Sequence, residues 1–294
     1  MPVIFEHHVK FNQTINDGSQ SAFALLSNSL ANTAHNLSNV QLKQAINKGA
    51  LWLTRGKSTQ RLRRIKKVLQ HNDELHFYYN EKVLSNNVLD ATLVSDEVEY
   101  SVWYKPYGML SQGSKWSDHC TIARFAQQHL TPERPVFIVH RLDRAATGLI
   151  LIAHSKKTAR ALTTMFENRT LSDNTLRKHY HIIVHGDHNK NEQPQLITSD
   201  IEGKQAQSTF TCLAYNQAKD QSLVEVKIDS GRKHQIRIHA ARIGLPVVGD
   251  RLHGIADINE TKDLQLCAVK LNFTCPLSGD NKKFELASQF KLLL

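Results

Sequence analysis

The stretch HRLDRAATGLILIAHS (140–155) holds the residues whose types and spacing best suit chemistry. VFIVHRL (136–142) and GLILIA (148–153) are short, aliphatic and bounded by turn residues, so both are predicted to be buried strands. Asp143 then lies where the chain turns at a sheet edge, a rigid place for a reactive carboxylate. Strand alternation puts Arg141 on the same face, where its charge would keep Asp143 ionised. Spacing alone still favours a surface aspartate in a hairpin turn beside an incidental arginine.

Three separated stretches resemble the motifs of the RluA family of RNA pseudouridine synthases, in the same order. HRLDRAATGLIL is similar to the family signature, in which HRLD is followed by two variable residues, Thr-Ser-Gly and an aliphatic run. WYKPYGM (103–109) and SGRKHQIRIHAARIGLPVVGD (230–250) resemble the other two motifs. Ala146 and Thr147 stand where the family usually has Thr and Ser, so we expect a looser turn beside Asp143 but an intact reacting group.

The resemblance assigns three catalytic residues. Asp143 becomes the catalytic carboxylate, and Arg237 becomes the partner that keeps it charged in a pocket closed to water. RKHYHIIVHG (177–186) resembles a fourth family element, Lys-x-Tyr, with Lys178 and Tyr180 at its positions. The resemblance makes Tyr180 the ring that stacks on the target uracil and can move its C5 proton. Without it, a tyrosine packed on a sheet is the better interpretation.

Six residues around these three are predicted to contact RNA. Arg141 is expected to bind a backbone phosphate or to occupy the vacated base stack, with Leu142 filling the gap beside a flipped base. Lys105 ends a strand and suits a phosphate contact, although such lysines are equally often only solvated. The other three predicted contacts are Lys178, Arg232 and His234.

Converting uridine to pseudouridine demands no cofactor, because the reaction involves neither a redox change nor a group donor. An ionised carboxylate near the sugar can act as a nucleophile or can remove a ribose proton, and the sequence leaves both open. The histidines of one predicted strand and its end, His179, His181, His185 and His188, alternate but have no carboxylate or cysteine at fixed spacing. We therefore predict no metal site.

A cationic run lies in the N-terminal part of the chain. Residues 38–80 have a net charge of +7 out of +10 for the whole chain. Seven cations fall within 55–67: Arg55, Lys57, Arg61, Arg63, Arg64, Lys66 and Lys67. Two predicted helices, 19–30 and 38–49, followed by short strands resemble the alpha-L RNA-binding module, so these cations are predicted to bind RNA. A solvated basic face is the plainer alternative.

The length of 294 residues suits two domains. We place the RNA-binding region at 1–81, a linker at 82–97 and the catalytic domain at 98–294. The resemblance implies an α+β fold, with a mixed, mostly antiparallel central sheet, flanking helices and a catalytic cleft. Four scattered cysteines and a start without a signal pattern predict a cytoplasmic protein without membrane contact, and we expect a monomer.

The pattern within the catalytic domain predicts alternating helices and strands. Helices are expected at 122–130, 155–171 with Ser155 as its N-cap, and 233–243, which carries His234 and Arg237. Antiparallel strands are expected at 208–216 and 222–230. CAVKLNFTCP (267–276) and KKFELA (282–287) are predicted to complete the sheet.

The sequence therefore predicts an RNA pseudouridine synthase with an N-terminal RNA-binding module. Family members with such a module tend to act on large-subunit ribosomal RNA, so ribosomal RNA is the first choice and transfer RNA the second. A catalytically inactive RNA-binding or ribosome-assembly factor is the alternative, supported only by Ala146 and Thr147. A carboxylate-dependent glycosidase lacks a second acid at a comparable site.

Overall fold

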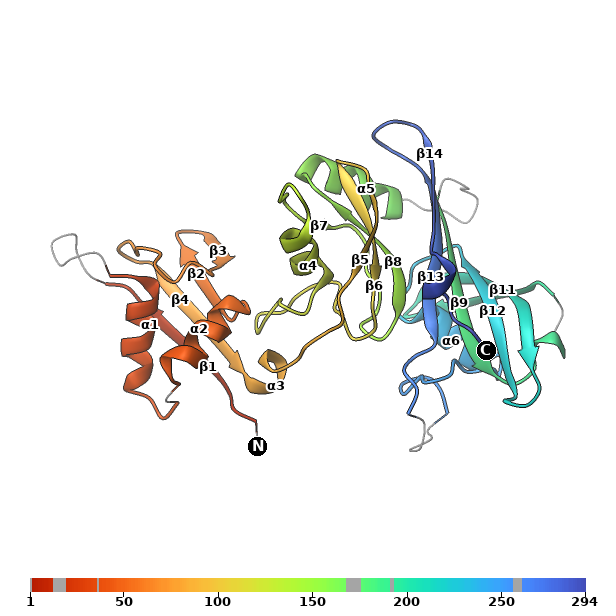
Figure 1. Cartoon of the computed structure of the whole chain (residues 1–294), viewed down its shortest axis with the longest axis horizontal. Helices are drawn as coiled ribbons and strands as arrows, with labels where there is room; N and C mark the ends of the chain where they lie inside the picture. The colour runs from red at the N-terminus through yellow and green to blue at the C-terminus, as the bar shows by residue number, and fades with distance from the viewer. Residues whose placement is uncertain (1, 13–19, 36, 168–175, 191–192, 256–260) are drawn as a thin grey trace. The chain divides into compact units, whose positions relative to one another are not determined.

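The computed structural model describes residues 2–12, 20–35, 37–167, 176–190, 193–255 and 261–294. The contacts within the chain divide it into two compact units. Unit 1 comprises residues 1–87 with 112–121, and unit 2 comprises 88–111 with 122–294. Figure 1 shows the elements of both in chain order.

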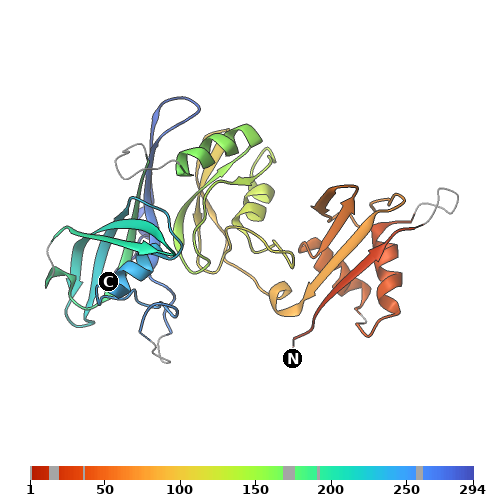
Figure 2. The same ribbon diagram turned by 180° about the vertical axis from the view of Figure 1, so that it is seen from behind.

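Unit 1 is a small antiparallel sheet covered on one side by two helices. Its strands occur in the order β1-β4-β2-β3. Figures 1 and 2 show α1 and α2 together on one face of these strands. The elements are β1 (Ile4–Lys10), α1 (Ala22–Ala31), α2 (Asn39–Asn47), β2 (Leu51–Arg55), β3 (Ser58–Arg61), β4 (Glu74–Asn80) and the short α3 (Glu81–Leu84).

Alternation along the strands explains this arrangement. On β4, Leu75, Phe77 and Tyr79 are buried, whereas the residues between them are only half-buried. The buried side chains join one apolar core with Leu26 of α1 and Ile46 of α2. Both predicted N-terminal helices are confirmed, and each begins at a serine cap: Ser21 accepts from Ala24 N, and Ser38 forms a capping box with Gln41. The first helix begins at Ala22, later than the predicted start at Ser19, which lies outside the described residues, and the second begins directly after Ser38.

Residues 112–121, from the middle of the predicted catalytic domain, belong to unit 1. Ser117 Oγ donates to Lys48 O at 2.8 Å, and Trp52 Nε1 donates to Lys115 O at 2.9 Å. The predicted linker 82–97 also contains structure, since it includes most of α3 and all of β5 (Thr92–Asp96). A contiguous division of the chain does not describe these units, because sequence order carries no sign that a loop returns to an earlier unit.

Unit 2 is built on a ten-stranded mixed sheet. The path of the sheet is β10-β11-β12-β9-β13-β8-β6-β5, with β14 beside β13 and β7 beside β8. All of its strand pairs are antiparallel except β13 with β8. The strands are β6 (Tyr100–Lys105), β7 (Phe137–Ile138), β8 (Thr147–Ala153), β9 (Leu176–His185), β10 (Gln195–Ile201), β11 (Lys204–Asn216), β12 (Gln221–Ile228), β13 (Leu266–Thr274) and β14 (Asn281–Glu285).

Both faces of this sheet are covered. One apolar core contains Ala126 of α4 (Ile122–His129) and Ile236 of α6 (Gln235–Arg242), and the other contains Leu162 of α5 (Lys156–Glu167). The central strand β8 lies between the two cores, and six of its seven residues are fully buried. This burial explains why GLILIA is a continuous apolar run without alternation.

Most predicted elements of unit 2 are confirmed, but the strand at 136–142 is wrong. The helices α4, α5 and α6 form where expected, and Ser155 Oγ accepts from Thr158 N at 3.0 Å as the predicted cap. Residues 168–171, the predicted end of α5, lie outside the described residues. β7 is only two residues long, so Arg141 and Asp143 lie on a loop and do not alternate along a strand.

Candidate active site

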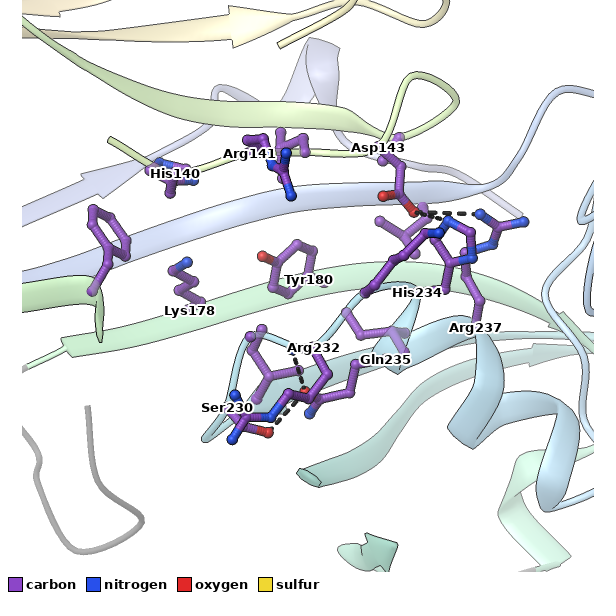
Figure 3. Close-up of a pocket in the computed structure, with 18 of the residues that line it drawn as sticks. His140, Arg141, Asp143, Lys178, Tyr180, Ser230, Arg232, His234, Gln235 and Arg237 are labelled. Carbon is purple, nitrogen blue, oxygen red and sulfur yellow. Dashed lines mark hydrogen bonds and ion pairs between the residues drawn. The ribbon is translucent and has the colours of Figure 1, made fainter. Parts of the chain in front are cut away.

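A pocket of about 570 Å³ opens in unit 2 between the loop 139–143, β9 and the segment that leads into α6. Its lining combines Asp143 and Tyr180 with Arg237, so the structure brings together all three residues predicted to be catalytic. Arg141, Leu142, Lys178, Arg232 and His234 also line it. Figure 3 shows Tyr180 on its strand, facing the loop that carries Arg141 and Asp143. Lys105 is the one predicted RNA contact of this domain that does not line the pocket.

Side chains, instead of a strand, hold the loop before Asp143. The pairing of β7 with β8 ends at Ile138. The following free amide of β8, Leu151 N, donates to a side chain instead, the Nε2 of the His140 ring at 3.0 Å. Burial and the charge of Lys178 hold the pKa of His140 well below its usual range, so the ring is neutral. Its Nε2 accepts, so the proton of the neutral ring is on Nδ1. His140 therefore takes the place of the strand that the sequence predicted.

The Arg237 guanidinium joins two carboxylates. Its Nε donates to Asp250 Oδ2 at 2.8 Å and its Nη2 to Asp250 Oδ1 at 2.5 Å, while its Nη1 reaches Asp143 Oδ2 at 3.3 Å. Burial opposes the charged form of Arg237, but the hydrogen bonds and charges of these carboxylates outweigh it and raise the pKa of Arg237. Arg237 is 5% exposed, so its positive charge is fixed beneath the pocket.

Asp250 is the partner that the sequence analysis missed. It is 4% exposed and also accepts from Leu252 N and His253 N. Burial opposes its charged form, yet the bonds from Arg237 and these two amides lower the pKa of Asp250. Its signal in the sequence is an acidic residue that ends the apolar turn LPVVGD (245–250), within the motif at 230–250, to which no separate role was assigned.

His234 completes the surroundings of Asp143. Its Nε2 lies 3.7 Å from Asp143 Oδ2, and its Nδ1 lies 2.9 Å from His253 Nε2. Burial lowers the pKa of His234, and the neighbouring charges of Arg237, His253 and Lys233 lower it further against the opposing effect of Asp143. The residue has a φ of +55° immediately before α6, which turns its ring toward the loop. The Asp143 side chain is 33% exposed, so its carboxylate is accessible from the pocket.

The opposite end of the pocket is aromatic and basic. Lys178 Nζ lies 4.3 Å from the centre of the Phe166 ring, and that ring also packs on His140 with centroids 4.4 Å apart. Tyr180 is 7% exposed and lies between this end and Asp143 along the pocket (Figure 3). The sequence predicted no role for Phe166 in this pocket. The pocket thus holds a ring, a cation and a carboxylate along its length.

The segment before α6 is fixed by Gln235. Its Oε1 accepts from Arg232 N and Ser230 Oγ, and its Nε2 donates to Gln207 O and Ser208 Oγ. Gln235 is 3% exposed, and its hydrogen bonds shape the turn. Arg232 remains exposed, and its Nε donates to Gln205 O at 3.2 Å. Arg141 is also exposed at the pocket rim.

Lys105 must be reassigned, since the structure contradicts its predicted contact with RNA. The residue is fully buried, and its Nζ donates to Pro106 O at 3.1 Å, Met109 O at 2.9 Å and Arg144 O at 3.5 Å. Burial lowers its pKa to about 7, against the opposing charge of Asp143. The sequence placed Lys105 at an exposed strand end, because it did not show that the next turn folds over the side chain.

Ala146 does not leave the turn beside Asp143 open. Ala146 N donates to Asp143 O at 3.1 Å, and Ala146 itself is buried. Thr147 keeps its hydroxyl, which donates to Leu266 O at 3.4 Å. Main-chain bonding closes this turn, so the expected loosening does not follow.

The basic run of unit 1 is divided between ion pairs and exposed charges. Arg55 binds Asp73 through two hydrogen bonds, and Arg61 and Arg63 both pair with Asp118. Arg61 also lies over the Trp52 ring, 4.3 Å from its centroid. By contrast, Lys57, Arg64 and Lys66 are exposed and Lys67 is half-buried. These four are the members of the run best placed to meet a polyanion.

Within the part of the chain that the structure describes, no group of three His, Cys, Asp or Glu side chains is arranged to hold a metal ion. The histidine pair of β9 approaches a carboxylate, with His179 Nδ1 3.4 Å and His181 Nε2 4.0 Å from Glu225. No helix among the described residues is long and apolar enough to cross a membrane.

Comparisons with known proteins agree with this geometry. Residues 99–242 match the family described as RNA pseudouridylate synthase. This region contains the loop that carries Asp143, and it also contains Tyr180 and Arg237. The chain carries a domain of this family. The RluA-type family expected from the motifs is thereby confirmed, and the enzymatic class is RNA pseudouridine synthase.

Two relatives and one solved structure illustrate the match. The chain is 32% identical over 174 residues to tRNA pseudouridine synthase C of Pectobacterium carotovorum, covering 49% of this chain and 45% of the relative. It is 28% identical over 169 residues to the ribosomal large subunit pseudouridine synthase D of Zymomonas mobilis, covering 50% and 51%. The human RNA pseudouridylate synthase domain containing 1 is 19% identical, with a TM-score of 0.55 over 70% of this chain and 86% of that one. This likeness confirms the predicted fold class of the synthase.

Proposed function

We propose that this synthase isomerises uridine in structured RNA with Asp143 as its catalytic carboxylate. The observation that carries the proposal is the arrangement of Asp143, which lies in the pocket 3.3 Å from the buried Arg237 and faces the strand of Tyr180. The Asp143 carboxylate thus lies beside a fixed positive charge and is partly exposed at the site where substrate must bind.

The reaction needs one bond broken and one bond made. The bond from uracil N1 to ribose C1′ breaks, the base rotates, and a bond from C5 to C1′ replaces it. The proton on C5 leaves, and N1 gains one, so the product is an isomer of uridine. The Asp143 carboxylate acts either by attacking C1′ or by removing a ribose proton.

Tyr180 and the pocket rim account for binding of a flipped base. A uridine within a helix cannot offer its sugar and C5 together to the carboxylate, so the nucleotide must leave the stack. The Tyr180 ring is placed for stacking on uracil, and its hydroxyl is the group proposed to move the C5 proton. Leu142 lines the same pocket, and exposed Arg141 suits the gap left in the RNA or a backbone phosphate.

We propose ribosomal RNA as the first substrate class and transfer RNA as the second. The names of the two relatives point to both classes. The N-terminal sheet with its two helices and exposed Lys57, Arg64 and Lys66 fits the proposed alpha-L RNA-binding module, which favours a large structured RNA. The predicted monomer and the cytoplasm as the place of reaction are part of this proposal.

The experiment separates these RNA classes. Ribosomal and transfer RNA, each labelled with tritium at uridine C5, are purified from cells lacking this protein and incubated with the full chain. Tritium release from ribosomal RNA alone supports the first choice, and release from transfer RNA alone replaces it with the second. Tight, salt-sensitive binding without release from either would identify an RNA-binding factor, and release of free uracil would identify a glycosidase.

A further inference from the structure

The main chain on both sides of Asp143 is bonded to one preceding segment, Lys105–Ser111. The hydroxyl of Ser111 contacts both backbone groups of Leu142: Leu142 N donates to Ser111 Oγ at 3.0 Å, and Ser111 Oγ donates to Leu142 O at 2.7 Å. Ser111 is 5% exposed and Leu142 is 8% exposed, so these polar groups are shielded from water.

The residue after Asp143 is bonded in the same way. Gly108 N donates to Arg144 O at 3.0 Å, and the buried Lys105 Nζ reaches the same carbonyl at 3.5 Å. Arg144 Nε in turn donates to Gly108 O at 3.3 Å. Asp143 therefore lies between two residues whose backbones are both bonded to the turn that follows β6.

The contacts of Ser111 matter more than those of Lys105 and Gly108, because no neighbouring strand supplies hydrogen bonds to the Leu142 main chain. β7 ends at Ile138, and the chain from 139 to 146 has no strand pairing. Buried backbone donors and acceptors require partners, and removing one partner costs more than a hydrogen bond contributes. One hydroxyl that donates and accepts replaces the two contacts a neighbouring strand would make.

We propose that Ser111 is a positioning residue for Asp143: its hydroxyl fixes the Leu142 main chain and thereby the direction of the carboxylate in the pocket. This inference rests on the proposed function of Asp143. Ser111 does not line the pocket and touches no reacting atom. A reacting group displaced by about 1 Å loses roughly 100-fold in rate, so the orientation of this loop matters for turnover more than for RNA binding.

The test compares two buried serines that lose the same atom. Ser111→Ala removes the contacts to Leu142. Ser101→Ala is the matched control, since Ser101 is fully buried on β6 and bonded to Trp103 Nε1 and His154 Nε2, outside the pocket. For each variant we would measure the melting temperature, kcat and KM on RNA, and hydrogen exchange at the Leu142 amide.

We expect kcat of Ser111→Ala to fall about 10- to 100-fold with KM changed less than about twofold. The Leu142 amide should exchange at least roughly tenfold faster, since it loses its acceptor. Ser101→Ala should lose thermal stability but keep kcat and Leu142 protection. Ser111→Cys, with a weaker donor and acceptor, should lie between Ser111→Ala and the wild type, and replaces Ser111→Ala if that variant does not fold.

Unchanged kcat in Ser111→Ala, or an equal fall in Ser101→Ala at equal loss of melting temperature, would overturn the proposal. Unchanged exchange at Leu142 would overturn it as well. The two proposals fail separately: an inactive wild type rejects the function of Asp143, while faster Leu142 exchange in Ser111→Ala would still establish that Ser111 holds this loop.

Discussion

At the scale of single residues, the electrostatics of the pocket depend on Arg237. Arg237 is buried and binds two carboxylates. It donates two hydrogen bonds to Asp250 and one to Asp143. Asp250 therefore neutralises and orients the guanidinium, and its third nitrogen, Nη1, is directed at the proposed catalytic carboxylate. Arginine suits this role better than lysine because its planar fork serves two carboxylates at once.

Replacing Asp250 tests this arrangement. Asp250→Asn leaves a buried guanidinium without its charged partner, and we expect a loss of about 3 kcal/mol in unfolding free energy. The kcat should also fall, because Arg237 is then free to turn toward Asp143. Chemical denaturation and steady-state rates would measure both effects. Asp220→Asn, in an exposed pair with Tyr215, is the matched control and should cost less than about 1 kcal/mol. A stable, fully active Asp250→Asn would contradict the account.

At the scale of elements, α6 carries the residues that connect the pocket to the sheet. Gln235, Arg237 and His239 all point into the protein from this short helix. His239 is fully buried between two hydroxyls, with Nδ1 3.0 Å from Ser208 Oγ and Nε2 3.0 Å from Ser199 Oγ. These contacts fix the helix on β10 and β11, and with it Arg237.

The pKa of His239 predicts how stability depends on pH. Burial, together with the charge of Arg242, lowers it from 6.5 to about 4. As the pH falls, the unfolded chain binds a proton before the folded one, so stability falls as the pH drops from about 6.5 to about 4, by up to about 3 kcal/mol. His239→Gln should remove this part of the pH dependence, and His129→Gln, at an exposed histidine, should not. Melting temperatures across this range would decide, and an unchanged slope in His239→Gln would refute the prediction.

The sequence predicted the elements with strong periodicity and missed those held by side chains. Continuous apolar runs identified β8 and alternation identified β9, while serines marked the starts of α2 and α5. The segment 136–142 is as apolar as a strand, yet the chain leaves the sheet after Ile138 because His140 and Ser111 supply its hydrogen bonds. Such tertiary contacts have no local signature in a single sequence.

The proposed catalytic residues were predictable for a different reason. Asp143, Tyr180 and Arg237 lie far apart in sequence, and their meeting in one pocket was implied by the motif resemblance. Without the resemblance, a surface aspartate and a tyrosine packed on a sheet were the favoured interpretations. Lys105 shows the limit of this approach. A lysine at a strand end is ordinarily exposed, and only the fold of the turn 106–109 over its side chain buries it.

At the scale of the whole molecule, positive charge is concentrated in the N-terminal unit but is only partly available. Arg55, Arg61 and Arg63 are held in ion pairs with Asp73 and Asp118. The exposed Lys57, Arg64 and Lys66 remain to meet a polyanion. The run of seven cations thus serves two purposes, since its paired members stabilise unit 1 and its exposed members supply the proposed RNA contact.

Salt dependence distinguishes these two groups. Replacing Lys57, Arg64 and Lys66 together with Gln should lower the slope of log affinity against log salt by about 2, because fewer phosphate counterions are released. The melting temperature should stay unchanged. The matched control replaces Lys156, Lys157 and Arg160, three exposed cations of α5, and should leave the slope unaltered. Equal slopes for both triple variants would refute a specific role of the N-terminal unit.

The measurement that tests the central claim most directly is tritium release from RNA labelled at uridine C5, comparing the wild type with Asp143→Asn. The substitution keeps the size of the side chain and removes its charge, and binding to the same RNA serves as the check on folding. We predict release by the wild type and a rate lower by about 10³ or more in the variant, with binding retained. Release by Asp143→Asn at a rate close to that of the wild type would contradict the account, since the reaction would then depend on another group.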